Sequence, residues 1–101
     1  MKYKLVYFDE VRQDVKEAKN WYRQIQPDLA KRFSTAIKES IFRLQKFPTS
    51  HAIRYKEVRI AHPKTFPYAI YYYIDEVASY IVIVAIVHTS RNPDFARKRI
   101  S

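Results

Sequence analysis

The 101-residue chain contains no cysteine and no glycine. Without cysteine it has no disulfide framework, no thiol nucleophile and no thiolate metal site, a composition compatible with a reducing cytoplasm. Without glycine it has no phosphate-binding loop of the P-loop or dinucleotide type, because both need glycine at fixed positions. We therefore expect no nucleotide cofactor, and the sequence indicates no other cofactor.

Long apolar runs and acidic residues are also scarce. The longest apolar run, Tyr80 to Val87, is strand-sized, well below the roughly 18 residues of a membrane span. The segment Met1 to Phe8 is too short and too charged to be a signal peptide, so we expect no membrane attachment. The net charge is +9, with 19 basic and 10 acidic residues. This excess favours nucleic acid, an acidic protein or an anionic surface as partner, and simple solubility is the alternative.

What the chain does contain fits one folded domain spanning residues 1–101. Hydrophobic residues make up 48% and aromatic residues 16%, enough for a core and too much for a disordered segment. The positive charge is spread along the chain, since residues 1–53 carry 11 basic and six acidic side chains and residues 54–101 carry eight and four. Any electropositive face must therefore be assembled by folding.

The first half predicts a strand and two helices. Lys2 to Phe8 is rich in aromatic and branched residues, as in a strand with one buried face. Asp9 follows at an N-cap position, and Pro27 breaks the helical pattern and starts a second helix that ends at Phe47-Pro48. The first helix carries one apolar stripe, in which we expect the tryptophan to pack between helix and sheet: Val11, Val15, Ala18, Trp21, Tyr22 and Ile25.

The second half predicts sheet. Arg54 to Ile60 reads as one charged strand near an edge, Tyr68 to Ile74 as a second strand, and Tyr80 to Val87 as a central strand covered on both faces. Asn92-Pro93-Asp94 provides a cap for a short final helix, Phe95 to Ile100. The predicted fold is α+β in the order β-α-α-β-β-β, a helical hairpin packed on a mainly antiparallel sheet with a short C-terminal helix.

His88 is the most interesting single residue, because it ends the most apolar strand and precedes Arg91 by three positions. There it can act as an acid or base beside a cation, or it can be a structural histidine satisfied by backbone. His51 and His62 fall in expected loops, and without a helical i, i+4 pair the three histidines do not indicate a metal site.

Aromatic and basic residues suggest a second kind of site. The tyrosines can stack on bases, although consecutive tyrosines on a strand alternate faces, so at least one of Tyr71, Tyr72 and Tyr73 belongs to the core. Arg54 and Lys56 would point the same way, with Arg59 near them. They form a phosphate-binding surface if they meet the basic residues at the end of the chain; otherwise they are a solvated face. Those residues are Arg91, Arg97, Lys98 and Arg99.

The order of elements and three segments together resemble one family. The segments are Phe47-Pro48, Phe66-Pro67-Tyr68-Ala69-Ile70-Tyr71-Tyr72 and Ile86-Val87-His88-Thr89-Ser90-Arg91-Asn92-Pro93. Over essentially the whole chain the pattern resembles the RelE/ParE superfamily of bacterial toxins from type II toxin-antitoxin modules. The resemblance implies a cytoplasmic toxin neutralised by a smaller antitoxin, which we expect to be acidic. One branch comprises ribosome-dependent mRNA endoribonucleases, and the ParE-like branch inhibits DNA gyrase.

The sequence departs from the nuclease branch at two positions. Ala69 stands where an arginine tends to follow the aromatic residue, and Phe95 lies where the nucleases tend to carry a proton-transferring side chain. If the protein is a nuclease, the catalytic residues implied are Arg59, His88 and Arg91. Residues expected to bind the target or nucleic acid are Arg54, Lys56, Tyr68, Arg97, Lys98 and Arg99.

Three hypotheses follow. The first is a ParE-like toxin that binds a macromolecular target, DNA gyrase, without being an enzyme. The second is a ribosome-dependent mRNA endoribonuclease, motivated by the positive charge and the tyrosines. The third is a basic binding module that has lost toxicity.

Overall fold

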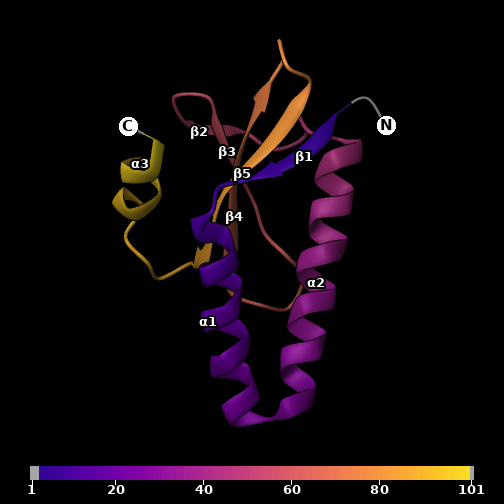
Figure 1. Cartoon of the computed structure of the whole chain (residues 1–101), viewed down its shortest axis with the longest axis vertical. Helices are drawn as coiled ribbons and strands as arrows, with labels where there is room; N and C mark the ends of the chain where they lie inside the picture. The colour runs from indigo at the N-terminus through magenta and orange to yellow at the C-terminus, as the bar shows by residue number, and fades with distance from the viewer. Residues whose placement is uncertain (1–2, 101) are drawn as a thin grey trace.

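A computed structural model describes residues 3–100 and has the predicted α+β class (Figure 1). Two long helices form a hairpin, five strands form one sheet, and a short helix ends the chain. The elements are β1 (Lys4–Tyr7), α1 (Glu10–Ile25), α2 (Pro27–Lys46), β2 (Ile53–Tyr55), β3 (Val58–Ala61), β4 (Tyr68–Asp75), β5 (Tyr80–His88) and α3 (Asp94–Ile100).

The sheet has the order β1-β5-β4-β3-β2. β1 pairs with β5 in parallel, and the other neighbours are antiparallel, so the prediction of a mainly antiparallel sheet is confirmed. β5 is central, and seven of its nine residues are buried. This burial explains its continuous apolar sequence, because helices cover both of its faces.

The prediction of one strand over residues 54–60 is wrong. Two short strands, β2 and β3, form a hairpin there, with Tyr55 paired to Val58 across Lys56 and Glu57. Lys56 has a φ of 49°. A left-handed residue is what a two-residue hairpin turn requires, and it is normally supplied by glycine or asparagine. Because neither Lys56 nor Glu57 is glycine or asparagine, the sequence did not indicate the turn.

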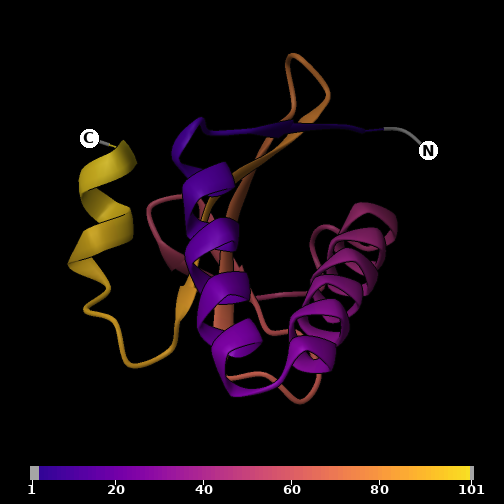
Figure 2. The same cartoon turned by 60° about the horizontal axis from the view of Figure 1, so that its bottom comes forward.

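The helical hairpin is joined by one extended residue, Gln26, after which Pro27 starts α2. The two helices run side by side in opposite directions in Figures 1 and 2. Asp9 precedes α1 as predicted, but its side chain makes no capping hydrogen bond, because its φ of −56° and ψ of −36° are already helical. The N-cap prediction is therefore right in position and wrong in mechanism.

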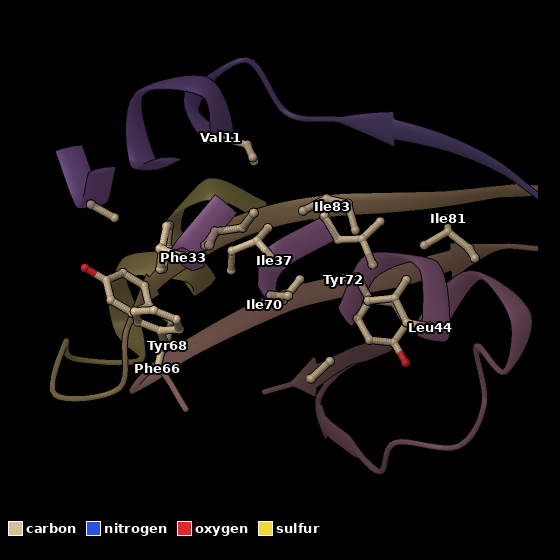
Figure 3. Close-up of a cluster of buried hydrophobic side chains, with 14 residues drawn as sticks. Val11, Phe33, Ile37, Leu44, Phe66, Tyr68, Ile70, Tyr72, Ile81 and Ile83 are labelled. Carbon is tan, nitrogen blue, oxygen red and sulfur yellow. The ribbon is translucent and has the colours of Figure 1, made fainter. Parts of the chain in front are cut away.

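The main core lies between the hairpin and one face of the sheet (Figure 3). Phe33 and Tyr68 pack at one end of it and Leu44 and Tyr72 at the other. Trp21 is not part of this core, because its side chain is 60% exposed. Successive helical residues are 100° apart, so Trp21 is turned away from the buried row formed by Val11, Val15, Ala18 and Tyr22.

The opposite face of β5 is covered by α3. Ala96, Phe95 and Ile100 pack there with Val84, Ala85 and Val87 of β5. Figure 2 shows α3 and α2 on opposite sides of α1. The C-terminal helix is therefore an integral layer of the fold, held against the most buried strand.

Candidate functional site

His88 is exposed at the end of β5, and its ring is held in one orientation. Its Nδ1 lies 3.0 Å from the Ser90 backbone nitrogen and 2.8 Å from the Ser90 hydroxyl. Because a backbone N–H can only donate, Nδ1 accepts, and the neutral ring carries its proton on Nε2. The ring also packs edge-on against Tyr68, with the ring centroids 5.4 Å apart. The arrangement agrees with the structural interpretation of His88 and leaves Nε2 as its remaining polar atom.

Arg91 lies in the same turn as His88. Its backbone N–H donates to the His88 carbonyl at 2.9 Å, and its guanidinium lies 3.9 Å from the centre of the Phe95 ring. Phe95 serves as a platform for this cation.

Arg59 is not brought together with His88 and Arg91. It pairs with Tyr72 across the sheet, whereas His88 pairs with Tyr68, four residues earlier on β4. Four residues of strand correspond to about 13 Å. The Arg59 guanidinium donates to the backbone carbonyls of Thr49 and His51, and so fixes the loop that follows α2.

Tyr68, expected at a binding surface, is part of the core. Its side chain is buried and its ring packs against Tyr22 and Phe33. Burial, with a smaller contribution from Tyr22, raises its pKa. The Phe66-Pro67-Tyr68 segment therefore anchors the start of β4 against the hairpin (Figure 3).

Arg97 of α3 meets two basic residues of the β2–β3 hairpin, Arg54 and Lys56, around Tyr55. The Arg97 guanidinium lies 4.7 Å from the Tyr55 ring centre, and the Lys56 ammonium lies 5.5 Å from it. Arg54 contributes to the same groove. We call Arg54, Tyr55, Lys56 and Arg97 the Tyr55 cluster. The groove beside it is lined by Arg54, Tyr55, Val58, Ile60, Tyr71, Pro93, Ala96, Arg97 and Ile100.

The Tyr55 cluster can bind an anion. Arg54, Lys56 and Arg97 are exposed, and Lys98 is exposed on the same helix, α3. The Arg97 guanidinium lies 3.7 Å from the Asp94 carboxylate. The Lys56 ammonium lies over the Tyr55 ring, which limits its motion, so together with the Arg54 guanidinium it suits a phosphate or carboxylate group.

Arg99 has a different position from the other basic residues of α3. Its guanidinium makes two hydrogen bonds to the Asp14 carboxylate, at 2.7 and 2.8 Å, and both side chains are at most 10% exposed. The carboxylate raises the pKa of Arg99. Arg99 also donates to the Val84 carbonyl at 3.0 Å, and Asp14 accepts from the Ile86 N–H at 3.0 Å.

The sequence did not reveal this ion pair, which binds backbone groups beside a β-bulge in β5. Tyr71 pairs with Ala85 and Tyr72 with Ile83, so Val84 is the extra residue of a β-bulge. Asp14 and Arg99 supply partners for the backbone groups beside the bulge, and thereby join α1, β5 and α3. Arg99 is therefore not part of an exposed binding surface.

Within residues 3–100 no group of three or more His, Cys, Asp or Glu side chains is placed to bind a metal ion. None of the helices in that range is long and apolar enough to cross a membrane.

Comparison with known proteins places the fold. A family model described as ParE toxin of type II toxin-antitoxin system, parDE, matches residues 5–93. A chain of the chromosomal ParDE toxin-antitoxin system from P. aeruginosa is similar, with a TM-score of 0.73, 19% identity, and coverage of 86% of this chain and 96% of that one. A chain of the toxin-antitoxin complex RelBE2 from Mycobacterium tuberculosis has a TM-score of 0.57, 16% identity and coverage of 87% and 99%. Curated proteins give no match.

Proposed function

The chain belongs to the ParE toxin family of type II toxin-antitoxin systems, and from this membership we propose that it arrests bacterial growth by inhibiting DNA gyrase in the cytoplasm. The observation that carries the proposal is the position of Arg59. Its guanidinium is bonded to the loop after α2, about four strand residues along the sheet from His88. A nuclease would need these groups around one phosphate, because phosphoryl transfer depends on converging charge and acid–base groups.

Two further positions support the same proposal. Ala69 is buried between neighbouring strands, and Phe95 is an aromatic platform for Arg91 and Arg99. Neither can transfer a proton or bind a phosphate. We therefore assign target recognition to the exposed cations of the Tyr55 cluster and to Lys98, with surface charge as the basis of inhibition.

A cognate antitoxin is the second proposed partner. Both solved neighbours described above come from toxin-antitoxin systems. Because this chain carries a net charge of +9, we propose that its antitoxin is acidic, and that charge attraction accelerates their association.

A ribosome-dependent mRNA endoribonuclease is the alternative. The observation in its favour is the aromatic ring with nearby cations in the Tyr55 cluster, because a tyrosine can stack on a base while neighbouring cations bind phosphate. His88 Nε2 and Arg91 are exposed on a neighbouring turn and would be its remaining catalytic groups.

The deciding experiment is a brief induction of the full chain in bacteria without antitoxin. New RNA 5′ ends are mapped across the transcriptome, and a DNA-damage reporter is read in the same culture. A rising damage response without codon-positioned cuts supports gyrase inhibition, and inhibition of supercoiling by purified gyrase should follow. Cuts at fixed codon positions in translated messages would establish the nuclease instead. Unimpaired growth at high expression would refute toxicity by either route.

A further inference from the structure

A row of four basic residues lies along one side of α1. Arg12, Lys16, Lys19 and Arg23 follow at steps of four, three and four, which places them on one helix face. We call them the α1 stripe. Three of them are exposed and Lys19 is half-buried. The two ion pairs found within residues 3–100 join Asp14 to Arg99 and Asp94 to Arg97, so neither includes the stripe.

The α1 stripe is not compensated within its own helix. Like charges one turn apart repel each other and lower helix stability. α1 has three acidic residues. Asp14 is bound to Arg99, Glu17 accepts a hydrogen bond from Gln13, and Glu10 does not stand three or four positions from any residue of the stripe. The only side-chain hydrogen bond of the stripe among the described residues is from Arg23 to the neutral Asn20 at 2.9 Å. An anionic partner would relieve this repulsion.

Apolar side chains form a wall beside the α1 stripe. One groove is lined by Tyr7, Phe8, Asp9, Val11, Arg12 and Val15, and a second by Arg12, Val15, Lys16, Lys19, Asn20 and Arg23. Because Arg12 and Val15 belong to both, the grooves form one trough from the end of β1 along α1. Tyr7 is 48% exposed in it, and Asp9 is its one acidic residue.

We propose that this trough binds an acidic amphipathic segment of a partner protein, which, if the proposed function holds, is the antitoxin. Apolar side chains of the segment cover Tyr7 and Val15, and its carboxylates pair with the α1 stripe. Nucleic acid fits less well, because its phosphates would neutralise the stripe and leave the apolar wall uncovered. The Tyr55 cluster shares no residue with the trough, so the partner and target surfaces are distinct.

The test uses two variants with the same net charge. Arg12→Ser/Lys16→Ser/Lys19→Ser removes most of the stripe. Lys31→Ser/Arg32→Ser/Lys64→Ser removes three cations from a separate groove between α2 and residues 64–66. Circular dichroism and thermal melting establish that both variants are folded. The probe is a displayed library of random peptides about 20 residues long, enough to lie along α1, selected on the immobilised full chain.

We expect the selected peptides to carry acidic and apolar residues on separate sides and to elute as salt is raised. Capture should fall at least about tenfold for the stripe variant and stay unchanged for the other. Equal loss in both variants, or enrichment of peptides without acidic residues, would refute the proposal. The proposal would also be refuted if duplex DNA bound the wild type but not the stripe variant, and no selected peptide competed with that DNA.

Failure here can be told apart from failure of the proposed function. A chain that arrests growth on induction but selects no acidic peptide refutes the trough assignment alone. A chain that selects acidic peptides through the stripe but has no effect on growth refutes the toxin proposal and leaves the surface intact.

Discussion

Asp14 and Arg99 are 85 positions apart in the sequence and bind the same β-bulge. We expect Asp14→Asn to lower the free energy of unfolding by about 3–5 kcal/mol, because it leaves a buried guanidinium without its counter-charge. Urea unfolding followed by far-ultraviolet circular dichroism measures the change. Asp94→Asn, at the exposed ion pair with Arg97, is the control and should change stability by less than about 0.5 kcal/mol. Equal effects of the two variants would show that the buried pair does not hold α3.

His51 gives stability a pH dependence. Burial lowers its pKa below 6.5, and the positive charges of His62, Arg43 and Arg59 lower it further. The folded state therefore binds the proton less readily than the unfolded state, so stability present at neutral pH is lost as pH falls through 6.5 toward the lower folded value. Asn is neutral and keeps a donor near the Tyr72 hydroxyl.

The prediction is that His51→Asn flattens the acid side of the stability profile. Urea midpoints measured between neutral pH and the acid range should fall less steeply for this variant than for the wild type. A His51→Asn variant that kept the wild-type slope would show that His51 is not the titrating group.

Individual contacts of this kind could not be predicted from the sequence. His88 was singled out from its place at the end of an apolar strand, and the structure placed it there. Asp14 gave no signal, because one carboxylate among polar residues of an amphipathic helix looks solvent-exposed. Arg99 was grouped with Arg97 and Lys98 by charge alone, although its position on α3 turns it toward β5.

At the scale of elements, the positive-φ residues of this glycine-free chain are the points of local strain. Thr65, Lys56 and Ser79 have φ values of 76°, 49° and 60°. Thr65 is the most strained, because a β-branched side chain fits the left-handed region poorly. We expect Thr65→Asn to raise the free energy of unfolding by about 0.5–1 kcal/mol, since asparagine tolerates this conformation.

Chemical denaturation measures this gain, and Thr35→Asn is the matched control. Thr35 is exposed within α2, where the same substitution relieves no strain and should not stabilise the protein. A stabilisation of equal size at both positions would mean that asparagine acts through the unfolded state and that backbone strain at residue 65 is absent.

The most predictable elements were those in which apolar residues recur at a regular spacing. Both hairpin helices were found from apolar residues at steps of three and four, and the break at Pro27 was placed correctly. The β2–β3 hairpin was missed because Lys56-Glu57 is not a recognisable turn sequence. The exposure of Trp21 was missed because adjacent apolar residues on a helix cannot both face the same sheet.

At the scale of the whole molecule, the net charge of +9 includes two basic surfaces, the α1 stripe and the Tyr55 cluster, which together hold seven of the 19 basic residues. Sequence alone gives the size of this excess, and the α1 stripe could have been found from its helical spacing. The Tyr55 cluster could not, because it forms only when α3 packs beside the β2–β3 hairpin. Because the two surfaces share no residue, binding of the antitoxin and inhibition of the target should be separable by mutation.

Toxicity should depend on the charge of the Tyr55 cluster and not on His88. We expect Arg54→Ser/Lys56→Ser/Lys98→Ser to relieve growth arrest, and we expect His88→Ala to retain it, since the His88 ring is held by Ser90 and Tyr68 and lies apart from Arg59. Growth and the DNA-damage reporter are followed after induction at matched protein levels, with Lys31→Ser/Arg32→Ser/Lys64→Ser as the control of equal charge. Loss of toxicity in a folded His88→Ala variant would contradict gyrase inhibition by surface charge and identify His88 as an acid or base, because the substitution leaves every cation of the Tyr55 cluster in place.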